Sequence, residues 1–169
     1  MSKSIIIYYS RADENYVSGT LKNLEIGNTE KVASIINKFT NAPMFKLEQT
    51  SPYSKNYNEC IDEAKADQEK DARPELKKMP ESIDDFDTIY LGYPNYWSTC
   101  PMAVFTFLER FDFSGKHIKA FCTHEGSGLG KSLDDIRQIA KNAESVDGLA
   151  IYGSRVDKCE DIVKSWINS

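Results

Sequence analysis

The sequence lacks the features that mark several large classes of protein. It has only two histidines, and its four cysteines are scattered and form no C-x-x-C pair, so we expect no structural zinc site. No apolar run approaches the roughly 18 residues of a membrane span, because the run at 5–9 ends at Ser10-Arg11. A formal net charge of −5 provides no basic surface for nucleic acid or anionic lipid. The sequence therefore predicts neither a membrane nor a nucleic-acid partner.

What remains is the composition of a globular domain. The chain has 169 residues, 40% of them hydrophobic and 11% aromatic, which suits one folded domain over 1–169. The N-terminal apolar run has no small-residue cleavage site and is typical of a buried strand, not of a signal peptide. Scattered cysteines are typical of free thiols in a reducing compartment. We expect a cytoplasmic protein.

Strand and helix patterns alternate along the chain. Short apolar runs predict strands at 5–9, 44–47, 88–93, 118–123 and 149–152. Apolar residues at helical spacing predict helices at 29–39, 57–70, 101–110, 129–140 and 156–167. Alternation of this kind indicates an α/β fold, a three-layer sandwich with a parallel sheet and helices on both faces. The simplest strand order for five such units is 2-1-3-4-5.

Ligands bind to such sheets at the carboxyl ends of the strands, where the strand order reverses. With the order 2-1-3-4-5, the loops after the first, third and fourth strands meet at that point. The first of these loops contains Ser10-Arg11 and ends in Gly27-Asn28-Thr29 at a helix start. Unpaired N–H groups at a helix N-terminus, with nearby hydroxyl and amide side chains, favour binding of a phosphate. Ordinary capping of the helix explains the same residues equally well.

The loop after the third strand is rich in aromatic residues and bracketed by prolines. It contains Pro94, Asn95, Tyr96 and Trp97 just beyond the end of a buried strand. Either aromatic side chain could stack on a planar ring. The alternative is that they cover the sheet edge or form a subunit contact, which is the commoner use of aromatic residues.

The loop after the fourth strand is rich in glycine and runs over 123–132. Its glycines allow the backbone to lie flat against a ligand and to offer N–H groups. Gly130-Lys131-Ser132 matches the end of the phosphate-binding G-x-x-x-x-G-K-[ST] motif, but Glu125 stands where its first glycine belongs. We therefore do not expect nucleotide hydrolysis. His124 could orient a substrate, although a lone loop histidine is more often solvated.

Together these loops, at the expected strand ends, resemble those of the flavodoxin family, and the order of elements resembles that family over nearly the whole chain. The resemblance implies a bound FMN that carries electrons. It implies that the cofactor-binding residues are Ser10, Arg11, Asn28, Thr29, Pro94, Asn95, Tyr96, Trp97, Thr123, His124, Glu125, Gly126, Ser127 and Gly128. By the resemblance the first loop holds the phosphate, and the second and third loops flank the isoalloxazine ring.

The chain departs from the family pattern in its first loop. Residues 12–26 are inserted between the two halves of a loop that is usually continuous. The insertion is either a flap near the cofactor, with Tyr16 close to it, or a surface excursion. No long insertion splits the last strand, so the chain resembles short-chain flavodoxins.

The expected function is an electron carrier, a monomer or homodimer, whose partners are redox proteins or a small-molecule electron acceptor. Its acidic helix at 57–70 is either a docking face or simply solvated. An FMN-dependent NAD(P)H or quinone oxidoreductase on the same fold is the competing enzyme hypothesis. A receiver-like signalling domain is disfavoured, because Tyr8-Tyr9-Ser10 stands where such a domain has paired acidic residues.

Overall fold

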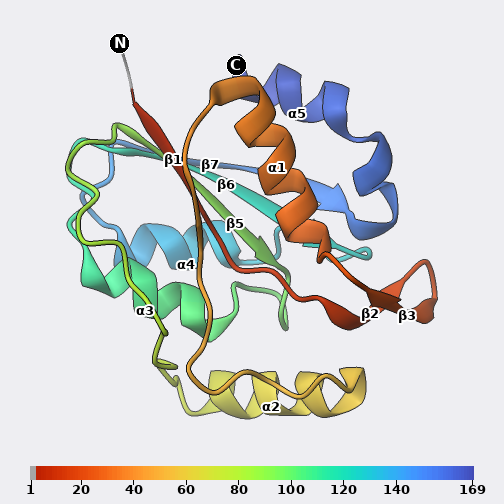
Figure 1. Ribbon diagram of the computed structural model, residues 1–169. Coiled ribbons are helices and arrows are strands. Elements are labelled where there is room, and N and C mark those ends of the chain that lie inside the picture. The colour runs from red at the N-terminus through yellow and green to blue at the C-terminus, as the bar shows by residue number, and fades with distance from the viewer. Residues whose placement is uncertain (1–2) are drawn as a thin grey trace.

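A parallel sheet forms the centre of the computed structural model, which describes residues 3–169 (Figure 1). Its strands are β1 (Ser4–Tyr8), β4 (Met44–Lys46), β5 (Thr88–Pro94), β6 (His117–His124) and β7 (Ser145–Tyr152). Their order is β4-β1-β5-β6-β7, and each neighbouring pair is parallel. Counted along the chain, this is the order 2-1-3-4-5, so the predicted fold class and topology are confirmed.

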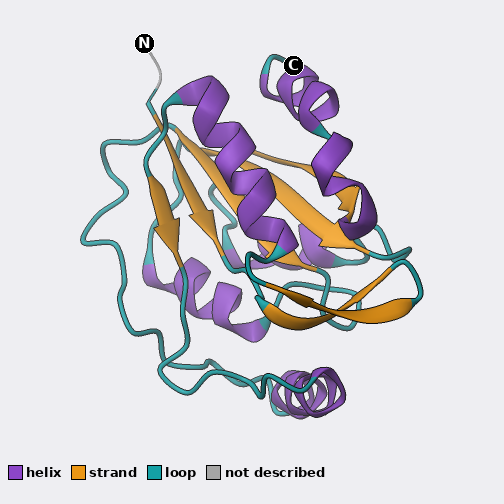
Figure 2. Ribbon diagram, turned by 45° about the vertical axis from the view of Figure 1, so that its right-hand side comes forward, coloured by secondary structure: helices purple, strands orange, loops and turns teal. Residues whose placement is uncertain are grey.

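Helices cover both faces of this sheet (Figures 1 and 2). The helices α1 (Asn28–Thr40) and α5 (Glu160–Ile167) lie on one face, and α3 (Met102–Arg110) and α4 (Ser132–Ile139) lie on the other. Helix α2 (Tyr57–Glu69) stands away from the sheet, below α3 in Figure 1. None of the helices described within residues 3–169 is both long and apolar enough to cross a membrane.

The alternation of side chains along each strand creates two cores. In β1, Ile5 and Ile7 belong to the core under α3 and α4, while Ile6 and Tyr8 belong to the core under α1 and α5. Because both faces of the central strands are buried, their sequences are continuous apolar runs. This is why the sequence predicts them well.

The structure corrects the sequence prediction at the two ends of the chain. Residues 12–26 contain an antiparallel hairpin, β2 (Asp13–Val17) and β3 (Thr20–Leu24), that was not predicted. Strand β7 begins at Ser145, four residues before the predicted start; the prediction missed these residues because Ser145 and Asp147 are exposed on an edge strand and interrupt the apolar run. The single closing helix predicted at 156–167 is divided into a 3₁₀ helix η1 (Gly153–Lys158) and α5.

Helix α2 uses its acidic residues internally. Asn56 caps the helix by accepting a hydrogen bond from the Glu59 N–H (3.0 Å). The carboxylate of Asp67 accepts from the Tyr53 hydroxyl (2.5 Å), and that of Glu63 accepts from the Ser54 N–H (2.8 Å). These bonds fix the incoming segment to α2, so part of the acidic face holds the helix in place.

Candidate functional site

A cavity of about 440 Å³ lies at the carboxyl ends of β1, β5 and β6, the place where the topology predicts a ligand site. Ligand sites in proteins usually have volumes of about 300–1,000 Å³. Its walls come from the three predicted loops, the hairpin, α2 and the start of η1. They are formed by Arg11, Asn15, Tyr16, Asn28, Thr29, Tyr57, Cys60, Ile61, Ala64, Pro94, Asn95, Tyr96, Trp97, Ser98, Thr123, His124, Glu125, Ser127 and Gly153.

The two halves of the first loop lie side by side, although the hairpin separates them in sequence. The Ser10 hydroxyl accepts a hydrogen bond from the Glu30 N–H in the first turn of α1 (3.0 Å). A Cβ on Gly27 would overlap Ser10 Oγ and lie 2.7 Å from the Arg11 carbonyl carbon, so only glycine allows this approach. The Thr29 hydroxyl bonds to that of Thr123 at the end of β6 (2.8 Å). The N-terminus of α1 is therefore held against the end of β6, where the third loop begins.

The hairpin is clamped onto the beginning of α2. The Arg11 guanidinium donates to the carbonyl oxygens of Glu14 (3.0 Å), Ser54 (2.9 Å) and Lys55 (2.9 Å). The Glu14 carboxylate accepts from the Tyr57 N–H (2.7 Å). The Arg11 side chain thus bridges backbone segments from opposite sides of the cavity.

The inner strand of the hairpin also supplies part of the cavity wall. The Tyr16 ring stacks on the Tyr57 ring with centroids 6.2 Å apart, and Asn15 and Tyr16 both face the cavity. Of the two readings of the insertion, the structure supports a flap.

The second loop is held by the amide of Asn95. This side chain donates to the Gly128 carbonyl (2.9 Å) and accepts from the Ser98 N–H (2.9 Å), so it joins the second loop to the third. Between Tyr96 and Thr99 the chain makes a tight turn whose central residues, Trp97 and Ser98, have φ values of 52° and 73°. Left-handed backbone is unfavourable for non-glycine residues and concentrates at functional sites.

The two aromatic side chains of the second loop have different surroundings. The Trp97 indole N–H donates to the Ile61 carbonyl of α2 (2.9 Å), although the residue is 43% exposed. Tyr96 packs edge-on against Tyr9 (5.9 Å), and its buried hydroxyl has no hydrogen-bond partner among residues 3–169. Burial raises the pKa of the Tyr96 hydroxyl well above its usual value, and burial also raises the pKa of the Cys60 thiol.

In the third loop, His124 has a structural role. Its Nδ1 accepts a hydrogen bond from the Gly126 N–H (2.8 Å), which assigns the ring proton to Nε2 in the neutral imidazole. The ring contacts Tyr152 at the end of β7 (4.4 Å between centroids). Burial lowers the pKa of His124, and the Glu125 carboxylate opposes that effect. Because His124 engages the Gly126 N–H, that group is not free to meet a ligand in this arrangement.

The side chain of Glu125 lies close to the first turn of α1. Its Oε1 is buried without a hydrogen-bond partner among the described residues. A Cβ on Gly153 would lie 2.9 Å from this oxygen and 2.6 Å from Asn28 Nδ2. The glycine therefore leaves room for a carboxylate and an amide that both face the same small space.

All but three of the predicted site residues line the cavity. The exceptions are Ser10, Gly126 and Gly128, which hydrogen-bond to Glu30, His124 and Asn95 respectively. Tyr16, which the flap interpretation had placed near the cofactor, is in the wall; the wall residues that the prediction omitted are Asn15, Tyr57, Cys60, Ile61, Ala64, Ser98 and Gly153. Tyr57, Ile61 and Ala64 were predictable as the inner face of a helix, but the pattern does not say that this face borders a cavity.

The residues present fit the FMN that the family resemblance implies. Asn28 and Thr29 offer N–H, amide and hydroxyl groups at a helix N-terminus, which suits a phosphate. Tyr96 and Trp97 offer aromatic surface for a planar ring. The Tyr96 hydroxyl is a buried polar group that no other residue within 3–169 satisfies.

Comparison with known proteins agrees with this geometry. A family model described as Flavodoxin matches residues 23–169, which leaves β1 and most of the hairpin outside the match. No curated protein matches the chain.

Several solved structures share the fold. A candidate flavoprotein from Bacteroides eggerthii is 20% identical, with a TM-score of 0.79 over 99% of this chain and 97% of that one. A similar protein from Bacteroides uniformis is 21% identical, with a TM-score of 0.78 over 99% of both chains. A flavoprotein from Lactobacillus acidophilus, solved in complex with FMN, is 21% identical, with a TM-score of 0.64 over 94% of this chain and 98% of that one. At these identities the likeness concerns the fold.

Proposed function

This chain belongs to the flavodoxin family, and on that basis we propose that it binds FMN in the cavity and carries electrons on it. One observation carries the proposal: the three loops predicted from the sequence converge on a single cavity at the carboxyl edge of the sheet. The bound FMN would supply the redox chemistry, and the protein would bind, orient and shield it.

Each wall of the cavity has its own part in this proposal. Asn28 and Thr29 hold the phosphate at the N-terminus of α1. Tyr96 and Trp97 cover the ring, and backbone groups of the third loop border its polar edge. The hairpin and α2 close the side away from the sheet and exclude water from the cofactor.

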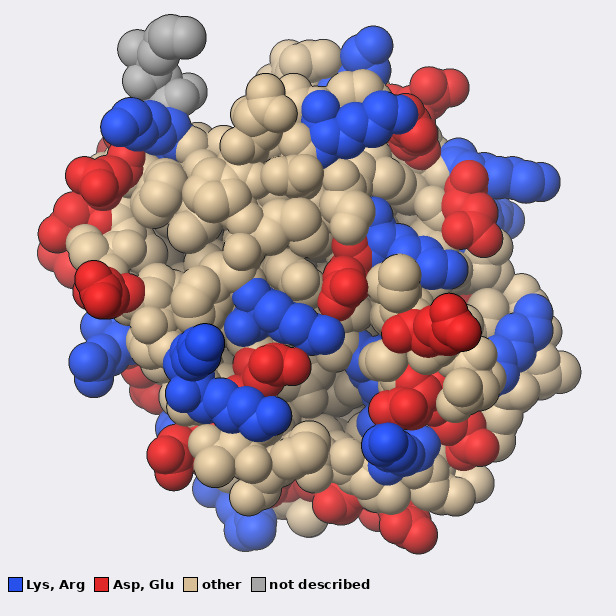
Figure 3. Space-filling view, in the orientation of Figure 1, with Lys and Arg blue, Asp and Glu red and all other residues tan. Residues whose placement is uncertain are grey.

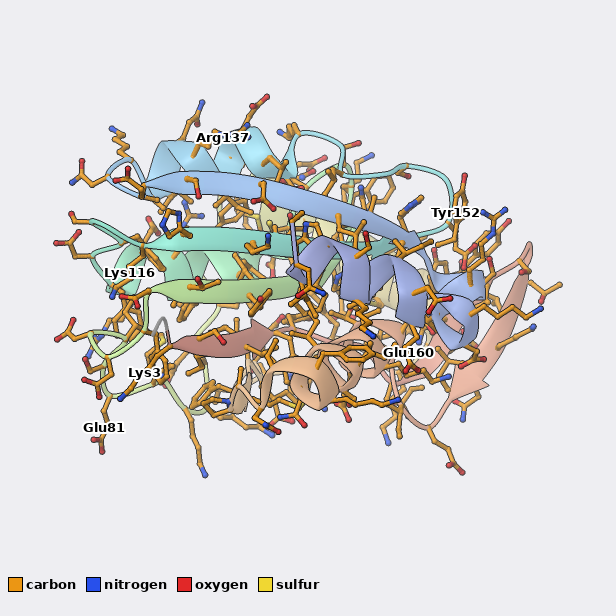
Figure 4. All side chains as sticks on the ribbon, turned by 90° about the horizontal axis from the view of Figure 1, so that it is seen from above. Lys3, Glu81, Lys116, Arg137, Tyr152 and Glu160 are labelled. Carbon is orange, nitrogen blue, oxygen red and sulfur yellow. The ribbon has the colours of Figure 1, made fainter. Side chains whose placement is uncertain are left out.

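The rim of the cavity supports a carrier that docks with other molecules. The exposed large apolar side chains on the described surface are Tyr16, Leu21, Ile26, Trp97, Tyr152 and Ile162. Three of them are in or next to the hairpin, and Trp97 and Tyr152 come from strand ends that border the cavity. In Figure 4, Tyr152 lies at the same end of the sheet as the hairpin, whereas Lys3 and Lys116 lie at the opposite end.

Charge makes a smaller contribution to docking in this proposal. On the face in Figure 3, lysine and arginine are interspersed with aspartate and glutamate, without a continuous field of one sign. The partner is then a redox protein or a small-molecule electron acceptor recognised mainly by apolar contact at the rim. We place the protein in the cytoplasm, as a monomer or homodimer, where its four buried cysteines remain thiols.

Absorption spectroscopy tests the cofactor. The purified protein is incubated with excess FMN and desalted, and we expect a retained yellow chromophore that denaturation releases as FMN. A matched pair of variants tests the site. Thr29→Val should weaken FMN binding roughly ten-fold, whereas Thr106→Val, the same change on α3 where the hydroxyl donates to Pro74, should not. A colourless protein that fails to quench FMN fluorescence would refute the proposal.

Turnover distinguishes a carrier from an enzyme. An FMN-dependent oxidoreductase would oxidise NAD(P)H with a quinone in steady state without any other protein. A carrier needs an external reductase, so we expect no turnover until one is added.

A further inference from the structure

Glu125 is one of two residues of the cavity with a buried side-chain oxygen that has no hydrogen-bond partner among residues 3–169; the other is Tyr96. In Glu125 this oxygen is Oε1. Buried carboxylate oxygens are normally hydrogen-bonded or paired with a cation. None of the ion pairs found among the described residues includes Glu125. The fold therefore does not use this carboxylate oxygen to stabilise itself.

The position of the carboxylate brings it to the anion-binding end of α1. Glu125 Oε1 and Asn28 Nδ2 both lie within 3 Å of the point that a Cβ on Gly153 would occupy, at 2.9 Å and 2.6 Å. Asn28 is the first residue of α1, and Thr29, which follows it, bonds to Thr123 in the same strand end that carries Glu125. A negative group at this place is favoured by the helix N-terminus. A second negative group beside it is repelled.

Three cations on or beside α1 bind groups other than Glu125. Lys31 pairs with Asp157 (3.7 Å), and Lys46 pairs with Glu30 (3.1 Å). The Arg11 guanidinium donates to three backbone carbonyls. Among residues 3–169, the carboxylate of Glu125 therefore has no ion-pair partner.

We propose that Glu125 is a specificity-determining residue whose carboxylate opposes the flavin phosphate at the N-terminus of α1 and so limits the preference for FMN over riboflavin. This inference rests on the proposed function, because it concerns the same cavity. Riboflavin is FMN without the phosphate, so it keeps every ring contact and loses the repulsion. The phosphate then adds less binding free energy than the helix N-terminus and the nearby hydroxyl groups would give it without Glu125.

Fluorescence titration of wild-type protein and two variants with FMN and with riboflavin tests the proposal. Glu125→Gln keeps the shape of the side chain and removes its charge. We expect it to lower the Kd for FMN roughly ten-fold, since removing one close like charge has an effect of that order. The Kd for riboflavin should stay within about two-fold of wild type. Glu144→Gln, the same change at the opposite end of the sheet just before β7, should leave both constants unchanged.

The variant should remain folded, because the buried oxygen that it alters has no partner to lose, and unfolding in urea checks this. Glu125→Ala provides a second measurement and should also strengthen FMN binding relative to riboflavin. If wild type and Glu125→Gln have the same Kd for FMN, or if the substitution changes the Kd for FMN and for riboflavin equally, this inference is overturned and the proposed function is not. Failure of every protein to bind either flavin would overturn the proposed function as well.

Discussion

Substituting Gly130 with alanine should separate the second and third loops. Gly130 has a φ of 54°, and a Cβ there would overlap the Ser98 carbonyl oxygen and lie 2.8 Å from its carbonyl carbon. Next to this contact, the Lys131 N–H donates to the same Ser98 oxygen (2.7 Å). The backbone cannot yield as a flexible side chain would, so the two loops must move apart.

The magnitude follows from two separable costs. Left-handed backbone costs a non-glycine residue about 1 kcal/mol. Forcing the loops apart adds roughly 2 kcal/mol, from overpacking and the lost hydrogen bond. Gly128→Ala is the matched control, because Gly128 has a φ of 62° but a Cβ there meets nothing within 4 Å. Gly128→Ala should therefore lose only the stability that the left-handed backbone costs. The difference in unfolding free energy between the two variants then gives the cost of the steric overlap with Ser98.

Urea unfolding of the cofactor-free proteins measures both variants. We expect Gly130→Ala to lower the free energy of unfolding by about 3 kcal/mol and Gly128→Ala by about 1 kcal/mol, at an unchanged m-value. Gly130→Ala should also weaken FMN binding more than its control, since it displaces the turn that carries Trp97. Equal losses of stability within about 0.5 kcal/mol would refute the reasoning, because the overlap with Ser98 would then have no energetic consequence.

Three further predictions, one of them with a control variant, concern other contacts in and around the site. Burial lowers the pKa of His124 from its usual 6.5, so the folded protein binds fewer protons there than the unfolded chain and loses stability as the pH falls below that value. His124→Gln should reduce this loss in unfolding curves recorded at about pH 7.5 and pH 5.5. Glu14→Gln weakens the acceptor of the Tyr57 N–H, so protease cleavage of the hairpin should accelerate about two- to five-fold, measured by limited proteolysis. Tyr96→Phe removes a hydroxyl that has no partner among residues 3–169, so the free energy of unfolding in urea should stay the same or rise. Its control, Tyr93→Phe, loses the hydrogen bond to the buried Ser132 hydroxyl and should lower that free energy by about 1 kcal/mol.

The sheet was predictable because burial on both faces makes the central strands continuously apolar, as in β1 with Ile5, Ile6 and Ile7. The hairpin was not, because most residues of β2 and β3 are exposed or half-buried and show no clear alternation. Its turn at Ser18-Gly19, with positive φ at both residues, is the one local signal that favours a hairpin.

For the site, the topology predicted where the loops meet, but not how their side chains are used. Asn95 and His124 turn out to organise the loops by bonding to Gly128 and to Gly126. The α2 wall could not be predicted for a related reason. The apolar spacing of Tyr57, Ile61 and Ala64 is the same whether that face packs on a core or borders a cavity. Only the position of α2 in the folded chain, away from the sheet, shows that this helix face borders a cavity.

The inserted hairpin gives this chain a wall that its family match does not include. The match begins at residue 23, whereas Asn15 and Tyr16 line the cavity. Because Gly27 lets the two halves of the first loop lie in contact, the insertion leaves the start of α1 assembled and adds a structure beside it. Arg11 is in that loop and also clamps the hairpin to α2. The start of α1, where we propose that the phosphate binds, and the flap are therefore joined through one residue, and a change at Arg11 should affect both at once.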